Sequence, residues 1–109
     1  MPFDETLAQR LRPLFQGNYK VAEKKMFGGL AFMVNGHMCC GIVGKNLVVR
    51  TGPETFDNAL KRPHARPMDF TGRPMKGFVY VAPAGYRSDL DLKSWTQSGL
   101  DFVLSQPPK

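Results

Sequence analysis

Asn35 and Gly36 form the turn signal that most constrains the fold of this chain. They separate two apolar runs, at residues 30–34 and at His37–Val43. Both central residues of a two-residue hairpin turn need a positive φ, which asparagine and glycine tolerate best. The sequence therefore predicts an antiparallel hairpin with a fixed register. Counting outward from the turn pairs Val34 with His37, Met33 with Met38, Phe32 with Cys39 and Ala31 with Cys40.

The remaining elements are predicted from turn residues and from the spacing of apolar residues. Asp4 is the expected N-cap of a first helix, which should bend or end near Pro13 because an interior proline costs about 3 kcal/mol or more. The strand region at Val21–Met26 continues through a bend or bulge at Gly28 and Gly29. Further elements are expected as a strand at 47–50, a short helix at 54–60, a strand at 77–81, and a final helix capped by Ser88 or Asp89.

This order of elements predicts a two-layer α+β domain in which helices pack on an antiparallel sheet, in the order α-β-β-β-α-β-α. A chain of 109 residues is enough for one domain, at residues 1–109. Both faces of the expected sheet carry apolar side chains, with Met33, Met38 and Cys40 on one and Phe32 and Cys39 on the other. We therefore expect helices on both faces or a homodimer.

Positive charge is concentrated in residues 61–76. The chain has a net charge of +6, and this segment contains five Lys or Arg residues and one acid, Asp69. Its prolines exclude an ordinary helix or a central strand. A restrained basic segment suits an anionic partner, although solvated surface charge would explain it equally well. The candidate partner- or anion-binding residues are Arg62, Arg66, Arg73 and Lys76.

The sequence contains no recognisable catalytic constellation. Cys39 and Cys40 are adjacent on an expected strand, so their side chains should point to opposite faces, and together with His37 and His64 they lack the spacing of a zinc site. His37 and Cys39 are about 7 Å apart along the strand, without a third orienting group. We therefore expect a non-enzymatic protein with no catalytic residue, no metal and no cofactor.

The chain also carries no signal for a membrane or for export. Its longest nearly apolar run, at residues 30–34, is too short to cross a bilayer, and its first residues lack a basic region followed by an apolar one. Two adjacent cysteines do not resemble a spaced disulfide framework. We expect a cytoplasmic protein that does not contact a membrane.

Two sequence blocks resemble the TfoX N-terminal domain family. The first is Lys-Lys-Met-Phe-Gly-Gly-Leu-Ala-Phe-Met at residues 24–33, followed by the Asn-Gly turn, and the second is Arg-Pro-Met-Lys-Gly-Phe-Val-Tyr-Val at residues 73–81. Residues 47–50 are similar to the third strand of that family. The resemblance implies a two-layer fold like that of secretion chaperones and a role in competence and transcriptional regulation. It implies no catalytic residues, and we expect a stand-alone domain without the helical C-terminal domain of full-length competence regulators.

Three functions are consistent with these observations. The first is a non-enzymatic regulatory module that contacts a protein partner. The second is a nucleic-acid-binding protein that uses residues 61–76. The third is an unrecognised small ligand-binding domain or enzyme, which a pocket joining His37 or Cys39 to Arg66 or Arg73 would support.

Overall fold

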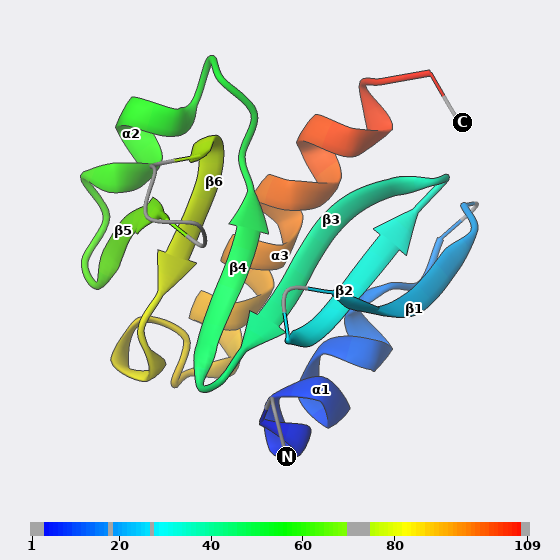
Figure 1. The fold of residues 1–109 in the computed structure, drawn as a ribbon, viewed down its shortest axis with the longest axis horizontal. Helices are drawn as coiled ribbons and strands as arrows, with labels where there is room; N and C mark the ends of the chain where they lie inside the picture. The colour runs from blue at the N-terminus through cyan, green and yellow to red at the C-terminus, as the bar shows by residue number, and fades with distance from the viewer. Residues whose placement is uncertain (1–3, 18, 27, 70–74, 108–109) are drawn as a thin grey trace.

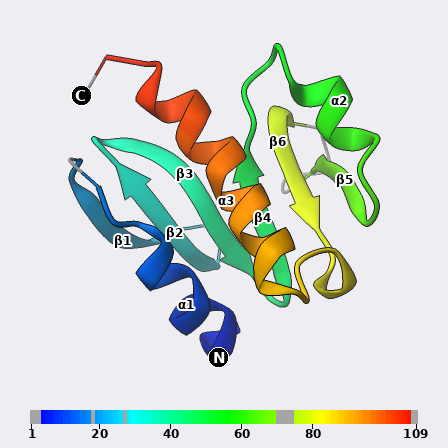
Figure 2. The same cartoon turned by 180° about the vertical axis from the view of Figure 1, so that it is seen from behind.

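The computed structural model describes residues 4–17, 19–26, 28–69 and 75–107, and for residues 26, 75 and 76 it describes the backbone alone. These residues form a six-stranded antiparallel sheet with three α-helices (Figure 1). The strand order is β1-β2-β3-β4-β6-β5. In Figure 2, α1 and α3 lie in front of the sheet. The predicted α+β class, with helices packed on an antiparallel sheet, is confirmed.

The elements have the following bounds. The strands are β1 (Val21–Met26), β2 (Gly29–Val34), β3 (His37–Val43), β4 (Asn46–Arg50), β5 (Ala65–Met68) and β6 (Met75–Val81). The helices are α1 (Glu5–Leu11), α2 (Phe56–Leu60) and α3 (Asp89–Leu104), with short 3-10 turns η1 (Arg12–Leu14) and η2 (Pro83–Gly85).

Two of the six strands were not predicted from the sequence. The sequence pattern indicated one bent strand up to Val34, but β1 and β2 pair with each other as an antiparallel hairpin. Gly28 has a φ of 71°, which lets the chain reverse there instead of bending. The second additional strand, β5, lies inside the basic segment and pairs with β6 at the edge of the described sheet. Pro67 has no amide to donate, so an edge position suits this strand.

A β-bulge changes the register of the central hairpin. The pairs of Val34 with His37 and of Met33 with Met38 are confirmed, and Asn35 and Gly36 both have positive φ. Beyond them Phe32 pairs with Cys40 and Ala31 with Gly41, so the other two predicted pairs are wrong. Cys39 is the extra residue of the bulge, which interrupts the alternation of side chains. Cys39 and Cys40 consequently both lie in the core beside α3, and the prediction of opposite faces is wrong.

The helix ends follow the predicted capping. The Asp4 carboxylate accepts hydrogen bonds from the amides of Thr6 and Leu7, at 2.9 and 3.3 Å. The first helix passes into η1 at Arg12–Leu14, which contains Pro13, as expected. Ser88 caps α3 by accepting a hydrogen bond from the amide of Asp91 at 3.0 Å. Only α2 differs, because it begins at Phe56 and not at residue 54.

The sheet has two unlike faces. The main core lies between the sheet and the helices, and Trp95, Phe32, Leu7, Leu11 and Ile42 are among its largest buried side chains. The opposite face carries a smaller cluster of buried residues, namely Ala31, Met38, Val48, Met68 and Tyr80. In the described residues, the buried apolar side chains of α1, α2 and α3 all belong to the main core. Helices on both faces are therefore not seen there, and the homodimer stays a prediction.

Candidate functional site

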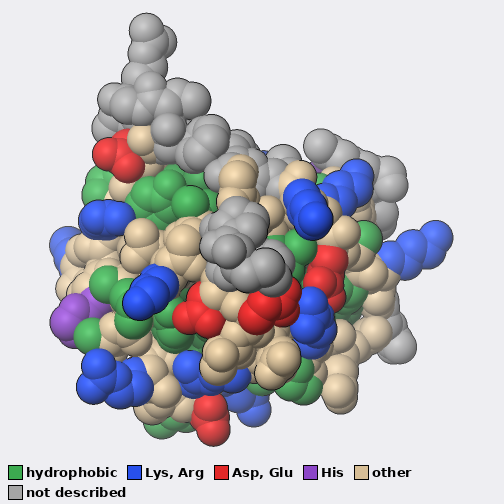
Figure 3. Space-filling view, turned by 60° about the horizontal axis from the view of Figure 1, so that its bottom comes forward, with side chains coloured by type: hydrophobic (Ala, Val, Ile, Leu, Met, Phe, Trp, Pro, Cys, Tyr) green, Lys and Arg blue, Asp and Glu red, His purple; other side chains and the backbone are tan. Residues whose placement is uncertain are grey.

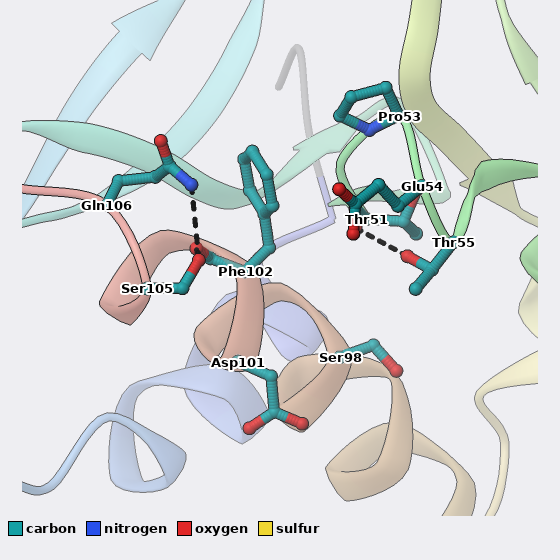
Figure 4. A pocket seen from close by; sticks show the side chains of 9 residues that line it. All are labelled: Thr51, Pro53, Glu54, Thr55, Ser98, Asp101, Phe102, Ser105 and Gln106. Carbon is teal, nitrogen blue, oxygen red and sulfur yellow. Dashed lines mark hydrogen bonds between the residues drawn. The ribbon is translucent and has the colours of Figure 1, made fainter.

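Three hollows lie in a row along α3, opposite the segment that leads from β4 past α2. The largest has a volume of about 560 Å³ (Figure 4). A hollow of about 160 Å³ shares Thr51, Thr55 and Ser98 with it. A third, of about 270 Å³, shares Arg62 with the second. Because neighbouring hollows share walls, we treat them as one surface feature, the α2–α3 groove.

One wall of the groove is a single face of α3. Asp91, Trp95, Ser98, Phe102 and Ser105 line it and recur every three or four residues. That spacing places their side chains on one side of a helix. The serines leave room because they are small and bond back to their own helix. Ser98 Oγ donates to the Ser94 carbonyl at 3.1 Å, and Ser105 Oγ donates to the Phe102 carbonyl at 2.5 Å.

The opposite wall is fixed by backbone contacts after β4. Thr55 Oγ1 donates to the Thr51 carbonyl at 2.6 Å, which holds the turn before α2. Gly52 has a φ of 83°, and a Cβ at this position would collide with the ring of Phe102. The ring can therefore lie directly on the Gly52 backbone only because residue 52 is glycine.

Acidic side chains dominate one end of the groove. Glu54 and Asp101 both line the largest hollow, next to the C-terminal turns of α3. The ion pairs found among the described residues are Arg10 with Asp89 and Arg12 with Glu23, so neither of these two carboxylates is in one. The carbonyl end of a helix adds partial negative charge. Both charged side chains that line this end are acidic, and the cation next to it is Arg50, whose Cζ is 5.2 Å from the centre of the Phe102 ring.

Arg62, a predicted site residue, lies at the middle of the groove and covers Trp95. Its Cζ is 3.5 Å from the centre of the Trp95 ring, and its Nη2 donates to Ser94 Oγ at 3.1 Å. Burial lowers the pKa of the Arg62 guanidinium, partly offset by the carboxylate of Asp91. Trp95 is only 1% exposed. The guanidinium thus already has an aromatic partner and a hydrogen-bond partner within the chain.

The other predicted site residues do not join Arg62 in the described structure. Arg66 is exposed, with its Cζ 5.0 Å from the centre of the Tyr80 ring, on the face of the sheet without helices. Arg73 and the side chain of Lys76 lie outside the described residues. Figure 3 shows Lys and Arg side chains interspersed with Asp and Glu over the visible face, and not gathered in one patch. A single basic surface built from all four residues stays a prediction.

The cysteines and histidines are not arranged around a hollow. Cys39 and Cys40 are fully buried, with their sulfur atoms 3.8 Å apart. The hydrogen bond with Cys39, and then burial, raise the pKa of the Cys40 thiol well above its ordinary value. His37 Nε2 donates to the Pro107 carbonyl at 2.7 Å. In the part of the chain that the structure describes, no three His, Cys, Asp or Glu side chains are grouped to hold a metal.

The groove was not predicted from the sequence, because the predicted site was based on clustered charges and not on small side chains that leave a hollow. The signal was present as two small hydroxyl residues at helical spacing, Ser98 and Ser105, beside the apolar stripe of α3. A second signal was Gly52, a small residue between a strand and a helix. Neither pattern is specific alone, because serine on a helix is usually only solvated.

Fold and groove together define a small α+β domain that presents an open groove between two helices on one side of its sheet. The chain belongs to the TfoX N-terminal domain family, whose model matches residues 13–103. The resemblance predicted from the sequence is therefore confirmed. Comparisons with curated proteins and with solved structures found no match. Among the described helices, none has both the length and the apolar character that crossing a membrane requires.

Proposed function

We propose that this chain is a non-enzymatic protein-interaction module of TfoX-type regulation, and that the α2–α3 groove is its docking surface. The observation that carries this proposal is the continuity of the groove along α3. From Asp91 to Ser105 a helix rises about 21 Å, at 1.5 Å per residue. An extended segment of about six residues has that length. The groove is longer than most small ligands and suits a stretch of polypeptide.

The state of the nucleophile candidates supports a role without catalysis. A cysteine reacts as its thiolate, and burial among core side chains disfavours that form of Cys40. His37 is hydrogen-bonded to a backbone carbonyl at the end of the chain. The hollows along α3 contain neither cysteine and do not contain His37. A docking role uses the groove without requiring chemistry from these residues.

Nucleic-acid binding is the second candidate, favoured by the net charge of +6. The exposed strand β1 adds Lys24 and Lys25 to the cations of residues 61–76. Binding to duplex DNA would weaken with salt, with a log–log slope of about −0.9 per phosphate contacted. Because Arg62 and Arg66 lie on opposite faces of the sheet, residues 61–76 alone provide fewer contacts than their charge suggests.

Site-specific photocrosslinking in cells separates these functions. A benzophenone amino acid is placed at Ser98 in the groove, at Arg66 on the helix-free face, and at Leu90, which is 78% exposed and outside the groove. We expect protease-sensitive adducts from Ser98 and none from Leu90. Adducts that nuclease removes would favour nucleic-acid binding. Protein adducts from Arg66 alone would contradict the groove as the docking surface.

A further inference from the structure

We infer that the acidic end of the α2–α3 groove receives a lysine or arginine side chain from an extended segment of a partner protein. This inference rests on the proposed function and specifies the chemistry of the partner. The groove is lined by three carboxylates, those of Glu54, Asp91 and Asp101, and by one guanidinium, that of Arg62. On a protein of net charge +6, the charged side chains that line this groove are thus mostly acidic, which is complementary to a basic segment.

The geometry at Phe102 indicates where such a side chain would lie. Lysine and arginine combine an apolar stem with a charged head, so they need an apolar wall that leads to a negative site. Phe102 and Pro53 supply the wall in the largest hollow. Glu54 and Asp101 supply the charge, and the last carbonyls of α3 add to it.

The Phe102 ring is held in place by contacts within the chain. Arg50 Cζ is 5.2 Å from the ring centre and also lies 5.4 Å from the centre of the Phe78 ring. Aromatic faces attract cations electrostatically. The ring also lies against Gly52, so its position is fixed before any ligand arrives. A preformed wall lowers the entropic cost of binding a flexible basic side chain.

The carboxylates are free to accept a new cation. Asp101 accepts a hydrogen bond from Gln97 Nε2 at 2.8 Å, which orients it without neutralising it. Glu54 and Asp101 are outside the ion pairs found in the described parts of the chain. At the other end of the groove Arg62 is held over Trp95. The basic side chain should therefore enter at the C-terminal end of α3, and not beside Arg62.

The test uses three capped eight-residue peptides of alternating serine and a second residue, which is lysine, acetyllysine or glutamate. Each peptide is titrated into the isotopically labelled full chain, and amide shifts are followed by NMR. We expect the lysine peptide to shift amides of residues 51–55 and 98–106. The lysine peptide can form two exposed ion pairs, with Glu54 and Asp101, that the acetyllysine peptide cannot form. We therefore expect the acetyllysine peptide to bind roughly three- to tenfold more weakly than the lysine peptide. The double variant Glu54→Gln, Asp101→Asn should remove this difference, while Asp57→Asn, on an exposed position of α2, should keep it.

The outcomes separate this inference from the proposed function. Equal binding of the lysine and acetyllysine peptides in the groove would overturn the charge preference and leave the docking groove standing. Shifts elsewhere, or no shifts with any peptide, would overturn the inference. The docking function itself would still be judged by the crosslinks from Ser98. The amide spectra of the variants show directly whether each one is folded.

Discussion

Cys39 and Cys40 are consecutive in β3, yet both sulfur atoms lie on the helix side of the sheet, 3.8 Å apart. The bulge at Cys39 causes this arrangement, because one extra residue cancels the alternation of a strand. Gly99 of α3 faces the pair directly. A Cβ at Gly99 would lie 2.9 Å from the Cys39 carbonyl oxygen and 3.2 Å from Cys40 Sγ. The helix therefore reaches the bulge only because residue 99 has no side chain.

Replacing Gly99 by alanine should destabilise the protein. Overpacking a core costs about 1–3 kcal/mol. The higher helix propensity of alanine than of glycine offsets up to about 1 kcal/mol of this destabilisation. The added carbon would meet a backbone oxygen, which cannot move alone, so we expect a net loss of about 1–2 kcal/mol in the free energy of unfolding. Urea denaturation measures this change. Lys93→Ala, at an exposed position of α3, is the control and should change stability by less than about 0.5 kcal/mol. An unchanged midpoint for Gly99→Ala would show that α3 is not tightly seated on the bulge.

Both thiols should be unreactive in the folded protein. They are fully buried, and the pKa of Cys40 is raised well above its ordinary value of 9.0, first by its hydrogen bond with Cys39 and then by burial. At about pH 8 we expect a thiol reagent to label neither cysteine in the native state and both in urea. Mass spectrometry counts the labels. Rapid labelling of the native protein would contradict the buried position of the pair.

The raised pKa of Cys40 also predicts a pH dependence of stability. A group whose pKa is higher in the folded state contributes stability below its unfolded pKa and loses it as pH rises through the folded pKa. Stability should therefore begin to fall above about pH 9. The Cys40→Ala variant has no such thiol and should show a shallower loss between about pH 8 and 10, measured by urea titration at each pH. Identical slopes for both proteins would be inconsistent with a folded-state shift.

Sequence reasoning located the parts of the fold that depend on local chemistry. The Asn35-Gly36 turn, the Asp4 and Ser88 caps and the end of the first helix near Pro13 all follow from residues next to one another. The bulge at Cys39 could not be predicted from neighbouring residues. No Gly or Pro marks it, and its register is set by packing against α3 and β4. Strand β5 was missed because Pro67 lowers strand propensity, although an edge position tolerates it.

The candidate site was harder to predict because it depends on distant segments. Arg62 and Arg66 are four residues apart, and their charge suggested one surface. The chain enters β5 between them, so one guanidinium lies over Trp95 and the other over Tyr80. The α2–α3 groove joins residues about 50 positions apart in sequence, which no local pattern specifies. Composition indicated an anionic partner, whereas three of the charged side chains that line the groove are carboxylates and one is a guanidinium.

The helix-free face of the sheet bears on the oligomeric state. Ala31, Val48 and Met68 are already buried on this face within one chain. Among the described residues, the exposed large hydrophobic side chains are Val21, Leu90 and Leu104, none of which belongs to this cluster. The partly buried side chains of Met33, Val43 and Phe78 pack against the cluster, so this face keeps some apolar surface, and we expect a homodimer that covers it. Light scattering after size exclusion measures the mass: a mass near twice 12.2 kDa would support the homodimer, and a mass near 12.2 kDa would contradict it.

Arg62 should control the environment of the single tryptophan. Its guanidinium covers the Trp95 ring at 3.5 Å, and Trp95 is the only tryptophan in the chain. Replacing Arg62 by alanine exposes one face of the indole to water. We expect tryptophan emission to shift to longer wavelength, with stronger quenching by acrylamide. Loss of a partly desolvated cation–π contact should lower stability by about 1–2 kcal/mol.

Arg66→Ala is the matched control for this substitution. It removes an arginine side chain that lies over the ring of Tyr80, on the opposite face of the sheet. This substitution should leave the tryptophan emission unchanged. Equal emission shifts in both variants would indicate general loosening of the fold and contradict a specific cover over Trp95. An unshifted Arg62→Ala spectrum would show that the surrounding core alone keeps water from the indole. In the expected case Arg62 forms the floor between two hollows of the α2–α3 groove, because its head stays on Trp95 and does not extend into solvent.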